Sequence, residues 1–240
     1  MKFLVFQHLS VEHPGVLREF WKADGIEYDA IELDEGETIP ASFDPYAALV
    51  VMGGPMDVWQ EEAHPWLVPE KQAIRKWIEE TGRPYLGICL GHQLLADAMG
   101  GEVGPGNSEV GLGTVTLTAA GAADPLLSGS PAEPECFQWH SAEVKQLPAG
   151  CEVLAGNDAC AVQAFRMGSN AYGFQYHVEI TEDTVAEWGS IPAYRASLEE
   201  IFGQDGLPKL AGQVEKRLAD FRHSAKRLND NFMELLRAKD

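Results

Sequence analysis

The fold is decided by PYLGICLGHQLLADAMGG, residues 84–101. Its first five residues form an apolar run typical of a buried strand, and His92–Met99 has the apolar spacing of a helix that ends at Gly100-Gly101. Cys89 therefore lies in a tight strand-to-helix turn. Glycines two residues before and two residues after it relieve steric crowding there, as in the G-x-S-x-G elbow that exposes a nucleophile. The positive end of the helix dipole favours the reactive thiolate.

The sequence around this stretch alternates strand-like runs with helical patterns. Lys2–Gln7, Ile26–Leu33 and Ala47–Met52 are predicted strands, and Pro14–Ala23 and Trp66–Glu80 are predicted helices. Ala47–Met52 is continuously apolar, as a parallel strand buried on both faces requires. This alternation predicts an α/β fold with a doubly wound, mostly parallel open sheet and helices on both faces.

The pattern changes after Gly101, where shorter strand-like pieces predict antiparallel additions to one edge of the sheet. These pieces are Gly113–Thr118, Glu152–Ala155, Ala161–Arg166 and Tyr172–Ile180. From Leu207 onward, apolar residues spaced by threes and fours predict one long C-terminal helix. We therefore divide the chain into a main domain, residues 1–204, and a helical extension, residues 205–240. The extension packs either on the same domain or on a partner, which includes a second copy in a homodimer.

Composition and charge exclude several classes of partner. The chain has 240 residues and a formal charge of -19, with 18 Lys and Arg against 37 Asp and Glu. The negative electrostatic field of this charge repels nucleic acids and anionic lipid surfaces. No apolar run approaches the ~20 residues of a membrane-spanning helix, so we expect a cytoplasmic protein. The four cysteines lack C-x-x-C spacing, which favours reduced thiols and argues against structural zinc.

A second motif supplies a base for the cysteine. Tyr172–Ile180 has the β-branched and aromatic content of a strand, and residues i and i+2 of a strand share a face. His177 and Glu179 would then lie side by side, with the carboxylate orienting the imidazole as general base toward a thiol. A solvated His-Glu pair at a strand end is the alternative interpretation of this motif alone.

A third motif offers hydrogen-bond donors. Gly53-Gly54 follows the buried strand Ala47–Met52, so its backbone N–H groups can converge with the N–H of Leu90 to stabilise an oxyanion. A simple turn is the alternative. His8 and His13 flank the first strand and could line a cleft, but surface positions are the favoured interpretation.

Together these residues resemble the class I, triad-type glutamine amidotransferases, and in particular stand-alone members similar to the glutaminase domain of GMP synthetase. Three blocks carry the resemblance, in the order and spacing of the family. They are Gly53-Gly54-Pro55-Met56, Gly87-Ile88-Cys89-Leu90-Gly91-His92-Gln93-Leu94-Leu95-Ala96 and Gln175-Tyr176-His177-Val178-Glu179. The resemblance covers residues 45–180, and its middle block is highly specific.

The resemblance implies an enzyme that hydrolyses the side-chain amide of glutamine through a cysteinyl γ-glutamyl thioester. Cys89 would be the nucleophile, His177 the base and Glu179 its partner. Gly54 and Leu90 would be the oxyanion donors. The substrate contacts would come from Gly53, Gln93, Trp139, His140 and Ser141.

Two departures from the family pattern are Val178, where proline is usual, and Ser141, where glycine is usual. The sequence also has no ATP pyrophosphatase motif and no G-x-x-x-x-G-K loop, so ammonia would pass to a separate synthase or be released. No metal or organic cofactor is implied. One alternative is a γ-glutamyl peptide or conjugate hydrolase that uses the same triad. Another is a non-catalytic binding or regulatory module.

Overall fold

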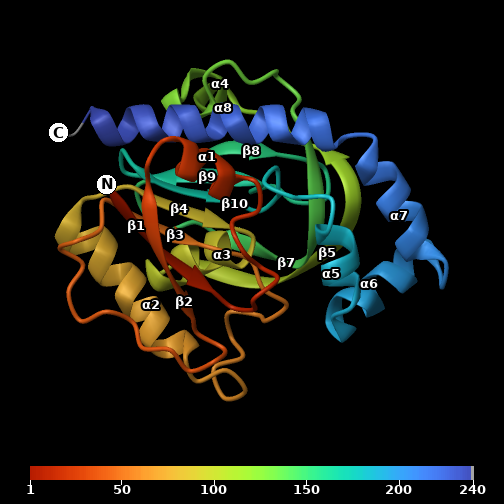
Figure 1. The fold of residues 1–240 in the computed structure, drawn as a ribbon, viewed down its shortest axis with the longest axis horizontal. Helices are drawn as coiled ribbons and strands as arrows, with labels where there is room; N and C mark the ends of the chain where they lie inside the picture. The colour runs from red at the N-terminus through yellow and green to blue at the C-terminus, as the bar shows by residue number, and fades with distance from the viewer. Residues whose placement is uncertain (239–240) are drawn as a thin grey trace.

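The computed structural model describes residues 1–238 and is built on an eight-stranded sheet (Figure 1). The strand order is β2-β1-β3-β4-β10-β9-β8-β6, and the first five strands are parallel. The strands are β1 Lys2–Gln7, β2 Glu27–Glu32, β3 Ala48–Val51, β4 Tyr85–Ile88, β6 Thr116–Leu117, β8 Cys151–Gly156, β9 Ala164–Met167 and β10 Ala171–Phe174. β9, β8 and β6 join antiparallel at one edge. The predicted doubly wound sheet with antiparallel edge additions is confirmed, but β10, which was expected among the antiparallel pieces, runs parallel to β4.

Helices cover both faces of this sheet. They are α1 Leu17–Ala23, α2 Leu67–Lys76, the π-helical turn η1 Trp77–Thr81, α3 Leu90–Ala98, α4 Ala119–Ala123, the 3₁₀ turn η2 Pro125–Leu127 and α8 Leu218–Arg237. Along β1, Phe3 and Val5 join the core under α1 and α8, whereas Leu4 and Phe6 join the core under α2 and α3. Successive side chains of a strand point to opposite faces, so the apolar stretch Phe3–Phe6 of β1 is buried on both sides.

A second, two-stranded sheet pairs β5, Glu102–Thr114, with β7, Glu135–Gln146. The register shifts between Pro105 and Glu109, so β5 bulges before it pairs again. The sequence pattern did not predict this pairing, because β5 contains glycine and proline at positions that usually interrupt a strand.

Three short helices form a cap beside the two-stranded sheet (Figure 1). They are α5 Thr184–Gly189, α6 Pro192–Phe202 and α7 Gly206–Glu215. Their apolar side chains share a third core with β7, which includes Trp139, Trp188 and Leu210. The expectation of one long helix from Leu207 was wrong, because the chain turns at Lys216-Arg217 before α8 begins. The domain division between residues 204 and 205 stays a prediction.

The described part of the chain, residues 1–238, contains no helix with the length and apolarity that a bilayer crossing needs.

Gly91 tests how tightly the strand-to-helix turn is packed. A Cβ atom at Gly91 would lie 2.1 Å from the carbonyl oxygen of Val51, so we expect Gly91→Ala to lower the free energy of unfolding by about 3 kcal/mol or more. Gly212, inside α7, is the matched control because an added Cβ meets nothing within 4 Å. Gly212→Ala should stabilise by about 0.5–1 kcal/mol. Urea titration of both variants measures the difference, and equal effects would contradict this account.

Candidate active site

The backbone at Cys89 has an unusual conformation. Cys89 joins β4 to α3 with φ 54°, and it is the one non-glycine residue with positive φ among residues 1–238. Such a conformation is strained for a residue with a Cβ. It persists because neighbouring backbone holds it: the Cys89 N–H donates to the Phe174 carbonyl at 2.7 Å, and the Gly91 N–H donates to the Met52 carbonyl at 3.0 Å. The predicted tight turn is confirmed.

His177 and Glu179 lie together, although the predicted strand does not reach them. β10 ends at Phe174, and His177 forms only an isolated bridge with Phe137 of β7. The strand prediction for Tyr172–Ile180 was therefore too long. The side chains still meet: His177 Nδ1 is 2.6 Å from Glu179 Oε1, and Glu179 Oε2 accepts from the Val178 N–H at 2.9 Å. The pair is buried, so it is not a solvated strand end.

Electrostatics tie this imidazole to the thiol. Burial disfavours the charged imidazole, but the Glu179 carboxylate and the Cys89 side chain outweigh burial and hold the pKa of His177 well above its usual value. Because Nδ1 faces Glu179, Nε2 is the ring nitrogen left for the sulfur. An imidazole held in this way can serve as general base for a thiol.

A cavity of about 90 Å³ opens over Cys89. It is lined by the sequence-predicted residues Gly54, Cys89, Gln93, Trp139, His140 and Ser141, together with Ala193, Tyr194 and Ser197 of α6. Leu90 begins α3 directly after the cysteine, and the first N–H groups of a helix have no partner within the helix. The cap was not anticipated as part of the site. Its residues reach the cavity through packing on β7, which no local sequence pattern encodes.

Two glutamine side chains connect the thiol to the pocket wall. Gln175 Nε2 lies 3.8 Å from Cys89 Sγ, and Gln175 Oε1 accepts from Gln93 Nε2 at 3.0 Å. Gln93 Nε2 also donates to the Ala142 carbonyl at 3.2 Å. Both side chains are buried. Gln93 thus sits in the pocket as the sequence predicts, whereas the contact of Gln175 with sulfur was not foreseen.

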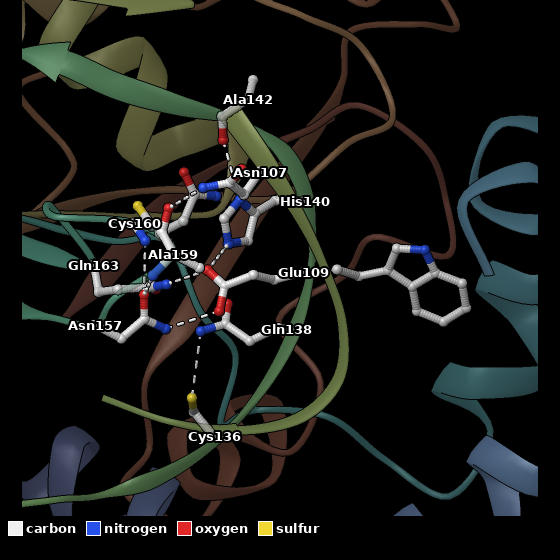
Figure 2. Close-up of polar contacts among 12 residues, drawn as sticks. Asn107, Glu109, Cys136, Gln138, His140, Ala142, Asn157, Ala159, Cys160 and Gln163 are labelled. Carbon is white, nitrogen blue, oxygen red and sulfur yellow. Dashed lines mark hydrogen bonds and ion pairs between the residues drawn. The ribbon is translucent and has the colours of Figure 1, made fainter. Parts of the chain in front are cut away.

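His140 is held in place by a half-buried carboxylate that no sequence pattern indicated. Figure 2 shows Glu109 of β5 beside the His140 ring, where Glu109 Oε2 lies 3.1 Å from His140 Nε2. Asn157 and Gln163 donate to the same carboxylate at 2.8 and 2.7 Å. Burial raises the pKa of Glu109, but the His140 ring and the hydrogen bond from Asn157 outweigh burial and lower the pKa. The cluster fixes the β7 segment that lines the pocket.

A further carboxylate lies next to His177 and Glu179. Glu12 follows β1, is 1% exposed, and accepts a hydrogen bond from the Tyr194 hydroxyl of the cap. Burial raises the pKa of Glu12 to about 7, although the charge of His177 and the Tyr194 hydrogen bond oppose the rise. Glu12 also packs against Gly53, because a Cβ atom there would lie 2.6 Å from Glu12 Oε2.

The stability of the fold should therefore depend on the charge of Glu12. Its pKa is raised from 4.5 to about 7 in the folded state, so folding binds protons in this range and the free energy of unfolding falls as pH rises through it. The loss is on the order of 3 kcal/mol. Glu12→Gln should remove this part of the decline. Urea unfolding of both proteins at pH 5 and pH 8 measures it, and equal declines would contradict the assignment.

Solved structures with the same architecture are glutamine amidotransferases. A glutamine amidotransferase from Thermotoga maritima superposes with a TM-score of 0.86, at 25% identity and over 98% of each chain. A glutamine amido transferase from Methylobacillus flagellatus superposes with a TM-score of 0.85 at 27% identity, covering 97% of this chain and 94% of that one.

Sequence relatives agree with this class. The chain matches the family described as glutamine amidotransferase class-I over residues 17–186. It is 32% identical over 183 residues to the glutamine amidotransferase-like protein YfeJ of Salmonella typhimurium, covering 74% of this chain and 75% of that protein. It is 34% identical over 158 residues to a glutamine-hydrolyzing GMP synthase subunit of Sulfolobus acidocaldarius, covering 65% and 78%. It spans only 32% of the GMP synthase of Caldicellulosiruptor saccharolyticus.

The fold and the cysteine elbow define a class I glutamine amidotransferase-like protein. The chain belongs to the class I glutamine amidotransferase family.

Proposed function

We propose that this protein hydrolyses the side-chain amide of glutamine to glutamate and ammonia, with Cys89, His177 and Glu179 as its catalytic triad. The observation that supports this most directly is the buried imidazole of His177, whose Nδ1 is 2.6 Å from Glu179 and whose electrostatic partners include the Cys89 side chain. Nucleophile, base and orienting acid then stand in the order that acyl transfer needs.

The reaction runs in two steps. His177 takes the proton of Cys89 Sγ, and the sulfur attacks the amide carbon. Collapse of the tetrahedral intermediate breaks the C–N bond, and His177 returns the proton to the departing ammonia, which leaves a γ-glutamyl thioester. Water, deprotonated by His177, then attacks the thioester and releases glutamate and the free thiol. The N–H groups of Gly54 and Leu90 stabilise the oxyanion in both steps.

The substrate contacts follow the pocket lining. Gln93 would lie beside the glutamine side chain, and the segment Trp139-His140-Ser141 would hold its amino-acid end, with Gly53 behind the reacting carbon. The positions of Gln93 and of Trp139, His140 and Ser141 around the Cys89 cavity support this assignment. Because the cavity holds only about 90 Å³, free glutamine suits it better than a γ-glutamyl peptide or conjugate.

A separate synthase would consume the ammonia. This part of the proposal is supported by relatives whose names mark them as single subunits of a GMP synthase. The chain carries no ATP-binding motif of its own. The cytoplasmic location, the homodimer and the helical extension as a docking element stay predictions.

Substitution of the nucleophile tests the proposal. We expect Cys89→Ala to lose glutamine hydrolysis by at least ~10³-fold, because the thioester cannot form. Cys151→Ser is the matched control, since Cys151 lies away from the cavity lining, and it should keep wild-type turnover. Release of glutamate and ammonia is the measurement.

The same assay separates the alternatives. Faster turnover of γ-glutamyl dipeptides than of glutamine would assign the conjugate hydrolase instead. Absence of turnover on both substrates, with no selective alkylation of Cys89, would favour the non-catalytic module and remove the proposal.

A further inference from the structure

A buried histidine that takes no part in the triad holds the backbone of the proposed oxyanion loop. His8 follows β1, and its Nδ1 lies 2.7 Å from the carbonyl oxygen of Gly53. The side chain is 0% exposed, so the expectation of a surface histidine was wrong for this residue. A contact this short to a carbonyl requires that Nδ1 carries the proton and donates it.

Because the peptide bond is planar, the contact between His8 and the Gly53 carbonyl also sets the direction of the Gly54 N–H. The described residues contain no cis peptide bond, and in a trans peptide the C=O of one residue and the N–H of the next point in opposite directions. A hydrogen bond that fixes the Gly53 carbonyl toward His8 therefore directs the Gly54 N–H away from His8. Gly54 lines the Cys89 cavity, where an oxyanion donor is needed.

Gly54 is confined in this orientation. A Cβ atom at residue 54 would lie 3.0 Å from Leu90 Cδ2 and 3.1 Å from His8 Cβ, so the loop runs closely between the imidazole and the first residue of α3. The two proposed donors, the N–H groups of Gly54 and Leu90, thus belong to residues in mutual contact. Glycine suits this approach because an added Cβ would require the Leu90 and His8 side chains to move by a few tenths of an ångström.

The imidazole is itself held from two further directions. His8 Nε2 lies 2.9 Å from Oε1 of Glu70 in α2, and Trp66 stacks on the ring with centroids 5.3 Å apart and planes at 15°. Both ring nitrogens face acceptors, as an imidazolium requires. Burial lowers the pKa of His8, but the Glu70 carboxylate outweighs it and raises the pKa above its usual value. A cation stacked on an indole face is also favourable.

We infer that His8, oriented by Glu70, is a positioning residue that fixes the Gly53-Gly54 peptide as an oxyanion donor. The inference rests on the proposed amide hydrolysis. His8 touches no reacting atom, so it acts through the backbone alone. Its loss should lower the rate of the chemical step and leave the binding of glutamine and the reactivity of the thiol largely unchanged.

Two substitutions separate this role from simple packing, because each preserves a different hydrogen bond of His8. In His8→Asn the amide nitrogen occupies the place of Nδ1 and can still donate to Gly53. In His8→Gln it reaches the place of Nε2 and can donate only to Glu70. We expect His8→Gln to lower kcat by ~10²-fold or more, the effect of a lost oxyanion donor, with KM within about threefold. His8→Asn should stay within about tenfold of wild-type kcat.

Alkylation of Cys89 by iodoacetamide is the internal control, because it forms no oxyanion; its rate should stay within about threefold in both variants. Equal losses of kcat in the two variants, or a parallel loss of alkylation, would overturn the inference. Glu70→Gln keeps the size of the side chain and removes its charge. If His8→Gln does not fold, this variant decides: a fall in kcat at unchanged KM supports the inference, and wild-type kcat overturns it.

Crystal structures of His8→Asn and His8→Gln give a readout that needs no turnover. The Gly53 carbonyl should keep its direction in the first and rotate in the second; an unmoved carbonyl in His8→Gln overturns the inference. If the wild-type protein hydrolyses no glutamine, the proposed function fails, whereas these two structures still decide whether His8 positions the peptide.

Discussion

The structure depends on one contact between backbones, the packing of α3 against the end of β3. Gly91 meets the Val51 carbonyl so closely that even a methyl group would be excluded, and this approach lets the chain turn at Cys89 with φ 54°. The turn directs the thiol toward the carboxyl ends of the parallel strands, where sites in open α/β sheets form. The packing of the sheet thus holds Cys89 in its strained backbone conformation.

The position of the His177 imidazole depends on a backbone contact outside the eight-stranded sheet. His177 exchanges both backbone hydrogen bonds with Phe137 of β7, at 2.8 and 2.9 Å. β7 in turn contributes Phe137 and Trp139 to the core under the cap. The cap helices therefore do more than cover the pocket: their packing on β7 supports the strand to which His177 is paired.

Local sequence patterns predicted the fold and the site where both depend on residues close together in the chain. The buried run Ala47–Met52 and the glycine-flanked Cys89 predicted the sheet and the elbow because burial and steric crowding act within a few residues. Local patterns failed where long-range contacts determine the structure, as in the pairing of β5 with β7 and the burial of Glu12 and His8. His177 and Glu179 were paired correctly from an incorrect strand. Their contact comes from one hydrogen bond, and the bridge to Phe137 that orients it is 40 positions away in the sequence.

The two buried His-Glu pairs, His177-Glu179 and His8-Glu70, differ in the group that each imidazole faces. His177 presents its free nitrogen to a thiol, which can give up a proton, so this pair suits proton transfer. His8 presents its nitrogen to a carbonyl, which cannot, so this pair can only hold geometry. Burying an ion pair contributes little net stability, hence stability alone is a poor reason for a second pair. The inferred orientation of the Gly53-Gly54 peptide explains the His8-Glu70 pair, because the reaction needs an oxyanion donor there.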